Sequence, residues 1–124
     1  MPAKPIYKPG PQHPITIEPL GSHVTVEAGG VIVAESDNAL SLKEASYPAV
    51  IYIPRSDAKM DLLRRSDHTS YCPFKGDASY FDIPAGGERA KNAVWTYEAP
   101  HEAVAAIKDH LAFYPDRVEA IRQS

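Results

Sequence analysis

Short runs in which apolar and polar residues alternate constrain the fold of this chain more than any other feature. The runs "ITIE", "HVTVEA" and "VIVAES" follow one another between residues 15 and 36, and Gly29-Gly30 separates the last two. A period of two places successive side chains on opposite faces of a strand, and a glycine pair between two such runs is typical of a hairpin turn. We therefore expect an antiparallel β-meander with one buried face.

Later runs predict further strands. "YPAVIYIP" (residues 47–54) is apolar almost throughout, as in a strand buried on both faces, and Pro54 ends it because proline cannot donate to the ladder. "DASYFDI" (residues 77–83) and "AVWTYE" (residues 93–98) predict two more strands, with the loop 84–91 between them. "RVEAI" (residues 117–121) is a candidate closing strand.

Two segments have the spacing of short helices. In residues 55–65, Ser56 or Asp57 is a suitable cap for the first turn. The second segment opens at Pro100, and its apolar residues Val104, Ile107 and Leu111 share one helical face. The predicted fold class is therefore mainly β (α+β), with antiparallel sheets and two short helices.

Proline defines the N-terminal boundary. Six of the 12 prolines precede Gly21, so neither a helix nor a central strand suits the start of the chain. We expect an extended proline-rich arm over residues 1–12 and a single compact domain over residues 13–124. The arm is either a frayed terminus or a segment packed on its own domain or on a neighbour.

Composition narrows the classes of partner. The net charge of −3 argues against a surface built for nucleic acid or anionic lipid, and "PAVIYIP" is too short to span a membrane.

The start has no pattern of a secretory signal, and a lone cysteine suits a reducing compartment, so we expect a cytoplasmic protein. The five histidines are scattered, and neither common glycine-rich phosphate motif occurs, so we expect no metal and no cofactor.

The stretch "SYCPFKGDASYFDI" (residues 70–83) contains the only thiol, Cys72. As a nucleophile it needs a nearby cation, which Lys75 or Arg55 would supply, and His68 would serve as the base. Free cysteine is more often a small buried apolar residue, and we favour that structural interpretation. Gly76 indicates a tight turn that fixes the direction of Lys75, and a lysine held in this way can form an anion site.

Two other groups of polar and aromatic residues lie at predicted strand ends. Arg55 and Asp57 follow the most apolar strand, where Asp57 either caps a helix or orients Arg55 toward a carboxylate or phosphate. Trp95 and Tyr97 share one face of their strand and Glu98 lies on the other. Paired aromatic residues belong to a core more often than to a cofactor platform.

The motif Cys72-Pro73-x-Lys75-Gly76-x-Ala78-x-Tyr80 resembles the most recognisable motif of a family of small, chiefly bacterial proteins. This family is catalogued as domain of unknown function four-two-seven and is sometimes labelled nucleotidyltransferase-like. Its other landmarks occur in the same order: His13-Pro14, Tyr52-x-Pro54-x-x-Asp57, Trp95-x-Tyr97-Glu98-x-Pro100 and Phe113-Tyr114-x-x-Arg117-Val118.

The resemblance implies a β-tent, in which two antiparallel sheets lean together around a groove. Relatives of the wider fold, such as methionine-R-sulfoxide reductases, hold zinc on paired cysteines, and this sequence has no such pair. The carboxylates that a magnesium-dependent transferase needs one residue apart on a strand do not follow Gly21-Ser22 either.

Three functional hypotheses remain open. The leading one is a domain, enzymatic or not, that binds a small anionic or zwitterionic molecule in a groove lined by Tyr52, Arg55, Asp57, Cys72, Lys75, Tyr80, Trp95 and Glu98. The second is a thiol-dependent enzyme with Cys72 as nucleophile or redox centre. Whatever the reaction, the candidates for catalytic residues are Cys72, Lys75 and Asp57. The third is a non-catalytic interaction module that acts through a homo-oligomer or another partner.

Overall fold

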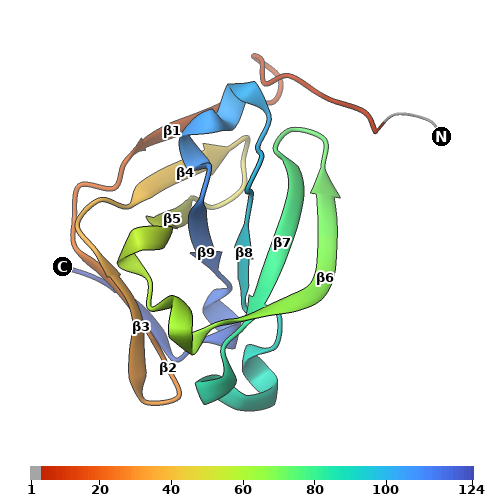
Figure 1. Ribbon diagram of the computed structural model, residues 1–124. Helices are drawn as coiled ribbons and strands as arrows, with labels where there is room; N and C mark the ends of the chain where they lie inside the picture. The colour runs from red at the N-terminus through yellow and green to blue at the C-terminus, as the bar shows by residue number, and fades with distance from the viewer. Residues whose placement is uncertain (1–3) are drawn as a thin grey trace.

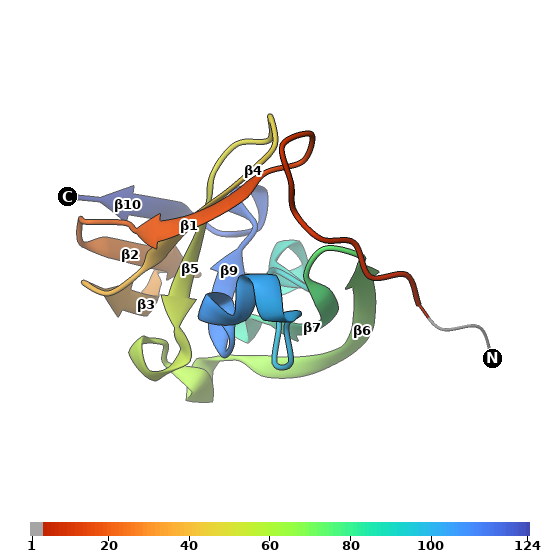
Figure 2. The same ribbon diagram turned by 90° about the horizontal axis from the view of Figure 1, so that it is seen from above.

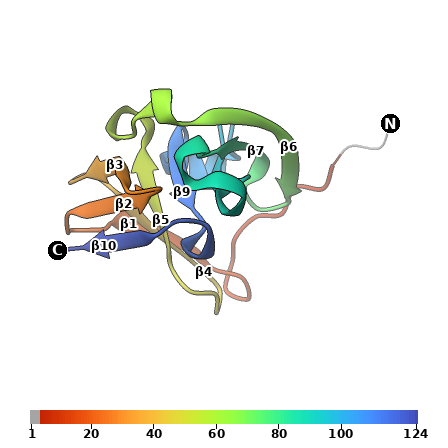
Figure 3. The same cartoon turned by 90° about the horizontal axis from the view of Figure 1, so that it is seen from below.

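The computed structural model describes residues 4–124, and in this part of the chain ten strands form two antiparallel sheets (Figure 1). The larger sheet has seven strands in the order β1-β4-β5-β9-β8-β7-β6, and the smaller has three in the order β10-β2-β3. Figure 3 shows β3, β2 and β10 side by side, next to the larger sheet. The expected mainly β class with antiparallel sheets is confirmed. The strands are β1 (Ile15–Pro19), β2 (Val24–Ala28), β3 (Val31–Ser36), β4 (Leu40–Glu44), β5 (Val50–Pro54), β6 (Arg64–Cys72), β7 (Gly76–Asp82), β8 (Val94–Thr96), β9 (His110–Phe113) and β10 (Ala120–Gln123).

The predicted hairpin around Gly29-Gly30 is present as β2–β3. The predicted meander is wrong in one respect, because β1 belongs to the other sheet and pairs with β4. The turn at Gly21, where φ is +79°, lies between β1 and β2. It lets the chain pass from the larger sheet to the smaller one.

The helical segments of residues 4–124 are 3-10 turns: η1 (Arg55–Asp57), η2 (Met60–Leu62), η3 (Pro84–Ala90), η4 (Glu102–Ile107) and η5 (Pro115–Arg117). Both regions predicted as helices contain such turns, but each is shorter than expected and is followed by a strand. Between η1 and η2, Lys59 N donates to Val33 O at 2.8 Å, which ties this segment to β3 and interrupts a continuous helix. After η4, Asp109 adopts a φ of +55° and the chain enters β9.

None of the helical segments in residues 4–124 is long and apolar enough to cross a membrane.

Alternation along the central strands produces two cores on opposite faces of the larger sheet. Ile53, Phe81 and Leu111 point toward the smaller sheet and pack with residues of β2 and β3. Their neighbours Tyr52, Tyr80 and Ala112 point the other way, into a second core that includes Val104 and Ile107 of η4. The second core contains most of the aromatic residues that concern function.

The described part of the N-terminal arm, residues 4–12, runs past the end of the β6–β7 hairpin (Figure 2). Tyr7 N donates to Pro73 O at 2.9 Å, and the Tyr71 hydroxyl donates to Pro5 O at 2.6 Å. The Tyr7 ring packs edge-on against Phe74. These residues therefore contact their own domain, whereas residues 1–3 of the predicted arm lie outside the described residues.

Candidate functional site

A cavity of about 220 Å³ opens on the face of the larger sheet that carries the second core. Two of its lining side chains are charged, Glu44 and Lys75, and three are aliphatic. The other six are aromatic, and we call this cavity the aromatic pocket: Tyr47, Tyr52, Tyr80, Trp95, Tyr97 and Tyr114.

Strand register brings these aromatic residues together. Tyr80 pairs with Trp95 across β7 and β8, and Trp95 pairs with the small, fully buried Ala112 of β9. The indole reaches past Ala112, and its Nε1–H donates to the Tyr52 hydroxyl of β5 at 3.3 Å. The Tyr52 and Trp95 ring planes are nearly perpendicular, at 86°, whereas Trp95 and Tyr114 lie 4.4 Å apart at 45°.

The pocket lies where the larger sheet is open. Register pairs join β5 and β9 only at Ile53–Leu111 and Pro54–His110. The remaining residues of β5 have no register partner in β9: Val50 and Tyr52 pair with β4 on their other side, and both line the cavity, as does Tyr114 beyond β9. A break in strand pairing therefore provides the space, and large aromatic side chains define its walls.

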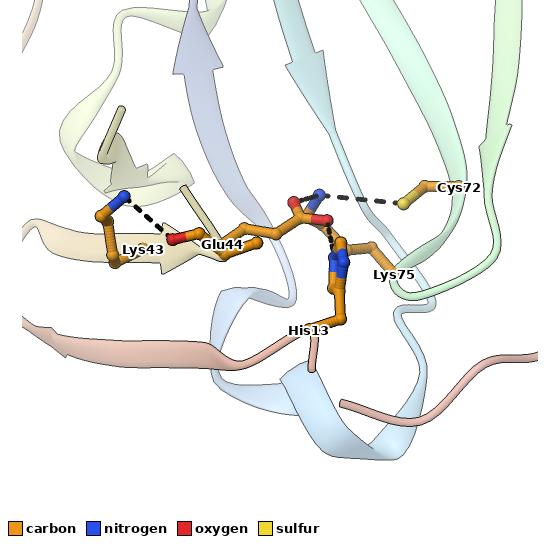
Figure 4. Close-up of polar contacts among 6 residues, drawn as sticks. His13, Lys43, Glu44, Cys72 and Lys75 are labelled. Carbon is orange, nitrogen blue, oxygen red and sulfur yellow. Dashed lines mark hydrogen bonds and ion pairs between the residues drawn. The ribbon is translucent and has the colours of Figure 1, made fainter. Parts of the chain in front are cut away.

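One ion-pair cluster lies at the wall of the pocket (Figure 4). The Glu44 carboxylate accepts from Lys75 Nζ at 2.5 Å through one oxygen and contacts His13 Nε2 at 2.7 Å through the other. The Lys75 and Glu44 side chains are only 12% and 15% exposed. Burial by itself raises the pKa of Glu44, but the hydrogen bonds from Lys75 and His13 outweigh it and hold the pKa below its ordinary value.

Local structure explains why these side chains converge. Lys75 N donates to Cys72 O at 3.1 Å, which closes the tight turn predicted between β6 and β7, and Gly76 has a φ of +114°. This turn directs Lys75 toward Glu44 at the end of β4. The His13 ring stacks on Phe74 at 3.9 Å, with an angle of 7° between the planes, and this contact fixes its orientation toward the carboxylate.

Cys72 lies beside this cluster. Its Sγ is 3.8 Å from Lys75 Nζ, and its side chain is half-buried against the second core. The thiol therefore has a neighbouring ammonium, but the same ammonium already binds the Glu44 carboxylate.

The structure divides the eight residues predicted for one groove. Tyr52, Lys75, Tyr80 and Trp95 line the aromatic pocket, and Cys72 adjoins it through Lys75. Arg55, Asp57 and Glu98 do not line this cavity.

Arg55 and Glu98 form a separate group. Glu98 accepts from Arg55 Nη1 at 3.0 Å and from Arg65 Nη2 at 2.6 Å, and both guanidinium groups lie over the Phe81 ring. Hydrogen bonding to Arg65 is the main reason that the pKa of Glu98 is lowered, against the opposing effect of burial. These ion pairs connect Arg55 at the start of η1 and Arg65 at the start of β6 to Glu98.

Asp57 has a structural partner. Its carboxylate accepts from the Ser36 hydroxyl at 2.6 Å, and the Ser36 oxygen accepts from Asn38 N. Neither Ser56 nor Asp57 caps η1, whose N-cap residue is Pro54 and which has no side-chain cap. Asp57 therefore joins η1 to the end of β3.

Sequence reasoning missed Glu44, the residue that binds both Lys75 and His13. The available signal was the alternation of Leu40 and Leu42 in "LSLKE", which would have predicted β4 and placed Glu44 at its end. Tyr97 and Tyr114 were present among the family landmarks, but nothing in their spacing indicated that they line one cavity with Tyr52.

No group of three or more histidine, cysteine, aspartate and glutamate side chains in residues 4–124 is placed to hold a metal ion.

These features define a small antiparallel β protein whose larger sheet carries an aromatic pocket with a largely buried ion pair at its wall. The chain belongs to the family described as Domain of unknown function (DUF427), whose sequence profile matches residues 16–124. The resemblance drawn from the sequence is thereby confirmed, and the match covers each landmark except His13-Pro14. No curated protein matches the chain.

Proposed function

We propose that this protein binds a small zwitterionic molecule in the aromatic pocket. The observation that carries the proposal is the Lys75–Glu44 pair, which is almost buried yet lines a cavity that is otherwise aromatic and aliphatic. A buried ion pair is weak evidence for stability, because desolvation of both charges offsets their attraction. Its presence at the wall of a cavity is better explained by recognition of a charged ligand.

The cluster favours a zwitterion over a simple anion. An ammonium group has three donors; Glu44 accepts from one of those of Lys75 and Cys72 Sγ weakly from a second, so one remains for a ligand carboxylate. Arg55, the second cation once expected here, binds Glu98 instead. The pocket therefore has one positive and one negative wall group, and a ligand with both charges matches it better than a polyanion.

The tyrosine hydroxyls provide further hydrogen-bond donors in the aromatic pocket. Burial, above all, raises the pKa of Tyr52 and of Tyr97 well above the ordinary value. Burial and the neighbouring Tyr80 raise the pKa of Tyr114 to about 12. These phenols consequently stay protonated at neutral pH, and their hydroxyls are suited to hydrogen-bond an anionic oxygen rather than to repel it.

The volume limits the size of the ligand. At about 220 Å³ the pocket is smaller than the roughly 300–1,000 Å³ of sites for drug-sized ligands. It suits a molecule of the size of one amino acid rather than a nucleotide. A cytoplasmic location would provide such metabolites, and the single free thiol supports it.

A thermal-shift screen of amino acids, amino-acid derivatives and simple carboxylates tests this proposal. A ligand present at about 100 times its Kd stabilises the folded state by about 2.7 kcal/mol, which raises Tm by several degrees. We expect Lys75→Met to abolish this shift, measured against the Tm of the ligand-free variant. The matched control Arg55→Gln removes a cation outside the pocket and should keep the shift. The proposal fails if no compound stabilises the protein, or if Lys75→Met responds as the wild type does.

One observation favours a second function, thiol-dependent catalysis by Cys72. The Lys75 ammonium lies 3.8 Å from Sγ, where it favours the thiolate. We rank this function second because Glu44 neutralises much of that charge. Thiol catalysis predicts that Cys72 is alkylated rapidly at neutral pH and more slowly in Lys75→Met. Slow alkylation at the same rate in both proteins would reject it.

A further inference from the structure

We propose that the cationic end of the ligand is a fully alkylated ammonium group held by the aromatic rings, so that the ligand is a betaine: a carboxylate joined to a quaternary ammonium. This inference rests on the proposed function of the same pocket and specifies the chemical class of the ligand.

The first argument is the shortage of free acceptors. A primary ammonium has three N–H donors that each require a partner. Glu44 is the only acidic residue that lines the pocket, and its two oxygens already contact Lys75 and His13. Of the five tyrosine hydroxyls that line the pocket, those of Tyr52 and Tyr80 are hydrogen-bonded to Trp95 and Ser70, so a primary ammonium would find neutral hydroxyls but no unengaged carboxylate oxygen. A quaternary ammonium has no N–H group and therefore needs none of these acceptors.

The second argument is the excess of aromatic surface. Six of the 11 lining residues are aromatic, and tryptophan and tyrosine are the side chains that attract cations most strongly to their ring faces. The rings of Tyr52 and Trp95 are nearly perpendicular and those of Trp95 and Tyr114 are inclined at 45°, so together they form walls in several directions. Quaternary ammonium ligands are recognised by aromatic cages of this kind.

The third argument concerns the two ends of the ligand. Lys75 comes from the turn between β6 and β7, whereas Tyr52 and Trp95 come from β5 and β8. Lys75 keeps one free donor for a carboxylate, and the rings offer a surface for a cation without hydrogen bonds. The two ends of a betaine therefore each have a distinct partner in one small cavity.

Isothermal titration of the full chain with a matched pair of probes tests this inference. Glycine betaine and 3,3-dimethylbutanoate have nearly the same shape and the same carboxylate, but a carbon replaces the charged nitrogen in the second. Because aromatic rings attract a desolvated cation, we expect glycine betaine to bind about tenfold tighter than 3,3-dimethylbutanoate. Glycine, which has a primary ammonium, should bind more weakly than glycine betaine.

Variants locate the effect. Trp95→Leu should reduce the advantage of glycine betaine over 3,3-dimethylbutanoate to less than about threefold, because the ring with the strongest attraction is lost. Tyr7→Leu removes an exposed ring outside the pocket and should leave the advantage intact. If Trp95→Leu does not fold, Tyr114→Leu replaces it, and the comparison of probes on the wild type stands without either variant.

The outcomes separate the two proposals. Equal affinity for glycine betaine and 3,3-dimethylbutanoate would overturn the alkylated cation and leave a carboxylate site that depends on Lys75. Tighter binding of glycine than of glycine betaine would overturn it as well, while supporting a zwitterion site for primary ammonium groups. If no probe binds and the thermal-shift screen also finds no ligand, both proposals fail.

Discussion

Glu44 is the residue on which the proposed site depends most. It has two partners from distant parts of the chain, His13 directly after the arm and Lys75 from the turn that follows β6. Without Glu44, the nearly buried Lys75 ammonium would lose its only carboxylate partner in the described residues. Sequence analysis identified Lys75 and the turn that fixes it, since a proline, a lysine and a glycine in close order are local signals. It did not identify Glu44, since the contact joins residues 31 positions apart.

We expect Glu44→Gln to reduce the free energy of unfolding at pH 7 by about 2 kcal/mol, because it leaves a nearly buried cation without its counter-charge. The pKa of Glu44 is lower in the folded state than in the unfolded state. The stabilisation is therefore complete above the unfolded value of about 4.5 and is lost as the pH falls through the folded pKa.

Urea denaturation of both proteins between pH 7 and pH 3 checks this prediction. The difference between wild type and variant should be constant down to about pH 5 and should shrink below it. Glu88→Gln is the matched control, because its ion pair with Lys91 is highly exposed, and it should change the free energy of unfolding by less than about 0.5 kcal/mol. A Glu44→Gln effect that persists unchanged at pH 3 would contradict the electrostatic explanation.

Among the elements, the strands with a clear apolar pattern could be predicted from sequence, whereas β4, β6 and β9 were not. β2 alternates between buried and half-buried residues, and β5 is apolar throughout. β6 has almost no buried side chain, so its sequence "RRSDHTSYC" has no apolar period, and it forms because it pairs with β7 along most of its length. β9 was hidden in a predicted helix, since its single buried run "LAF" is too short to distinguish the two structures.

The turn between β2 and β3 provides a test at this scale. Gly29 and Gly30 both have positive φ, but a Cβ atom at Gly29 would overlap the backbone oxygen of Ala85 in η3, whereas none lies near one at Gly30. We expect Gly29→Ala to cost about 3 kcal/mol in unfolding free energy and Gly30→Ala about 1 kcal/mol. Thermal unfolding of the two variants measures the difference. Equal losses would show that η3 does not pack against this turn as described.

For the whole molecule, the mainly β class and the two antiparallel sheets could be predicted, but the position of the aromatic pocket could not. The pocket results from the opening between β5 and β9 and from the small Ala112 beside Trp95, and both depend on the register of strands that are distant in sequence. Arg55 was predicted beside Lys75 because both follow strand ends. The structure instead pairs Arg55 with Glu98. The candidate site therefore has a single cation, Lys75, and a larger proportion of aromatic residues than expected.

The central claim is that a betaine enters the aromatic pocket and contacts Lys75 and the rings. The chain has one tryptophan, so one indole N–H resonance reports directly on this cavity. In a titration with glycine betaine followed by proton–nitrogen correlation spectra, we predict that the Trp95 indole signal shifts and saturates in the wild type and stays in place in Lys75→Met. An indole signal that does not move in the wild type up to millimolar glycine betaine, or that moves equally in both proteins, would contradict the account.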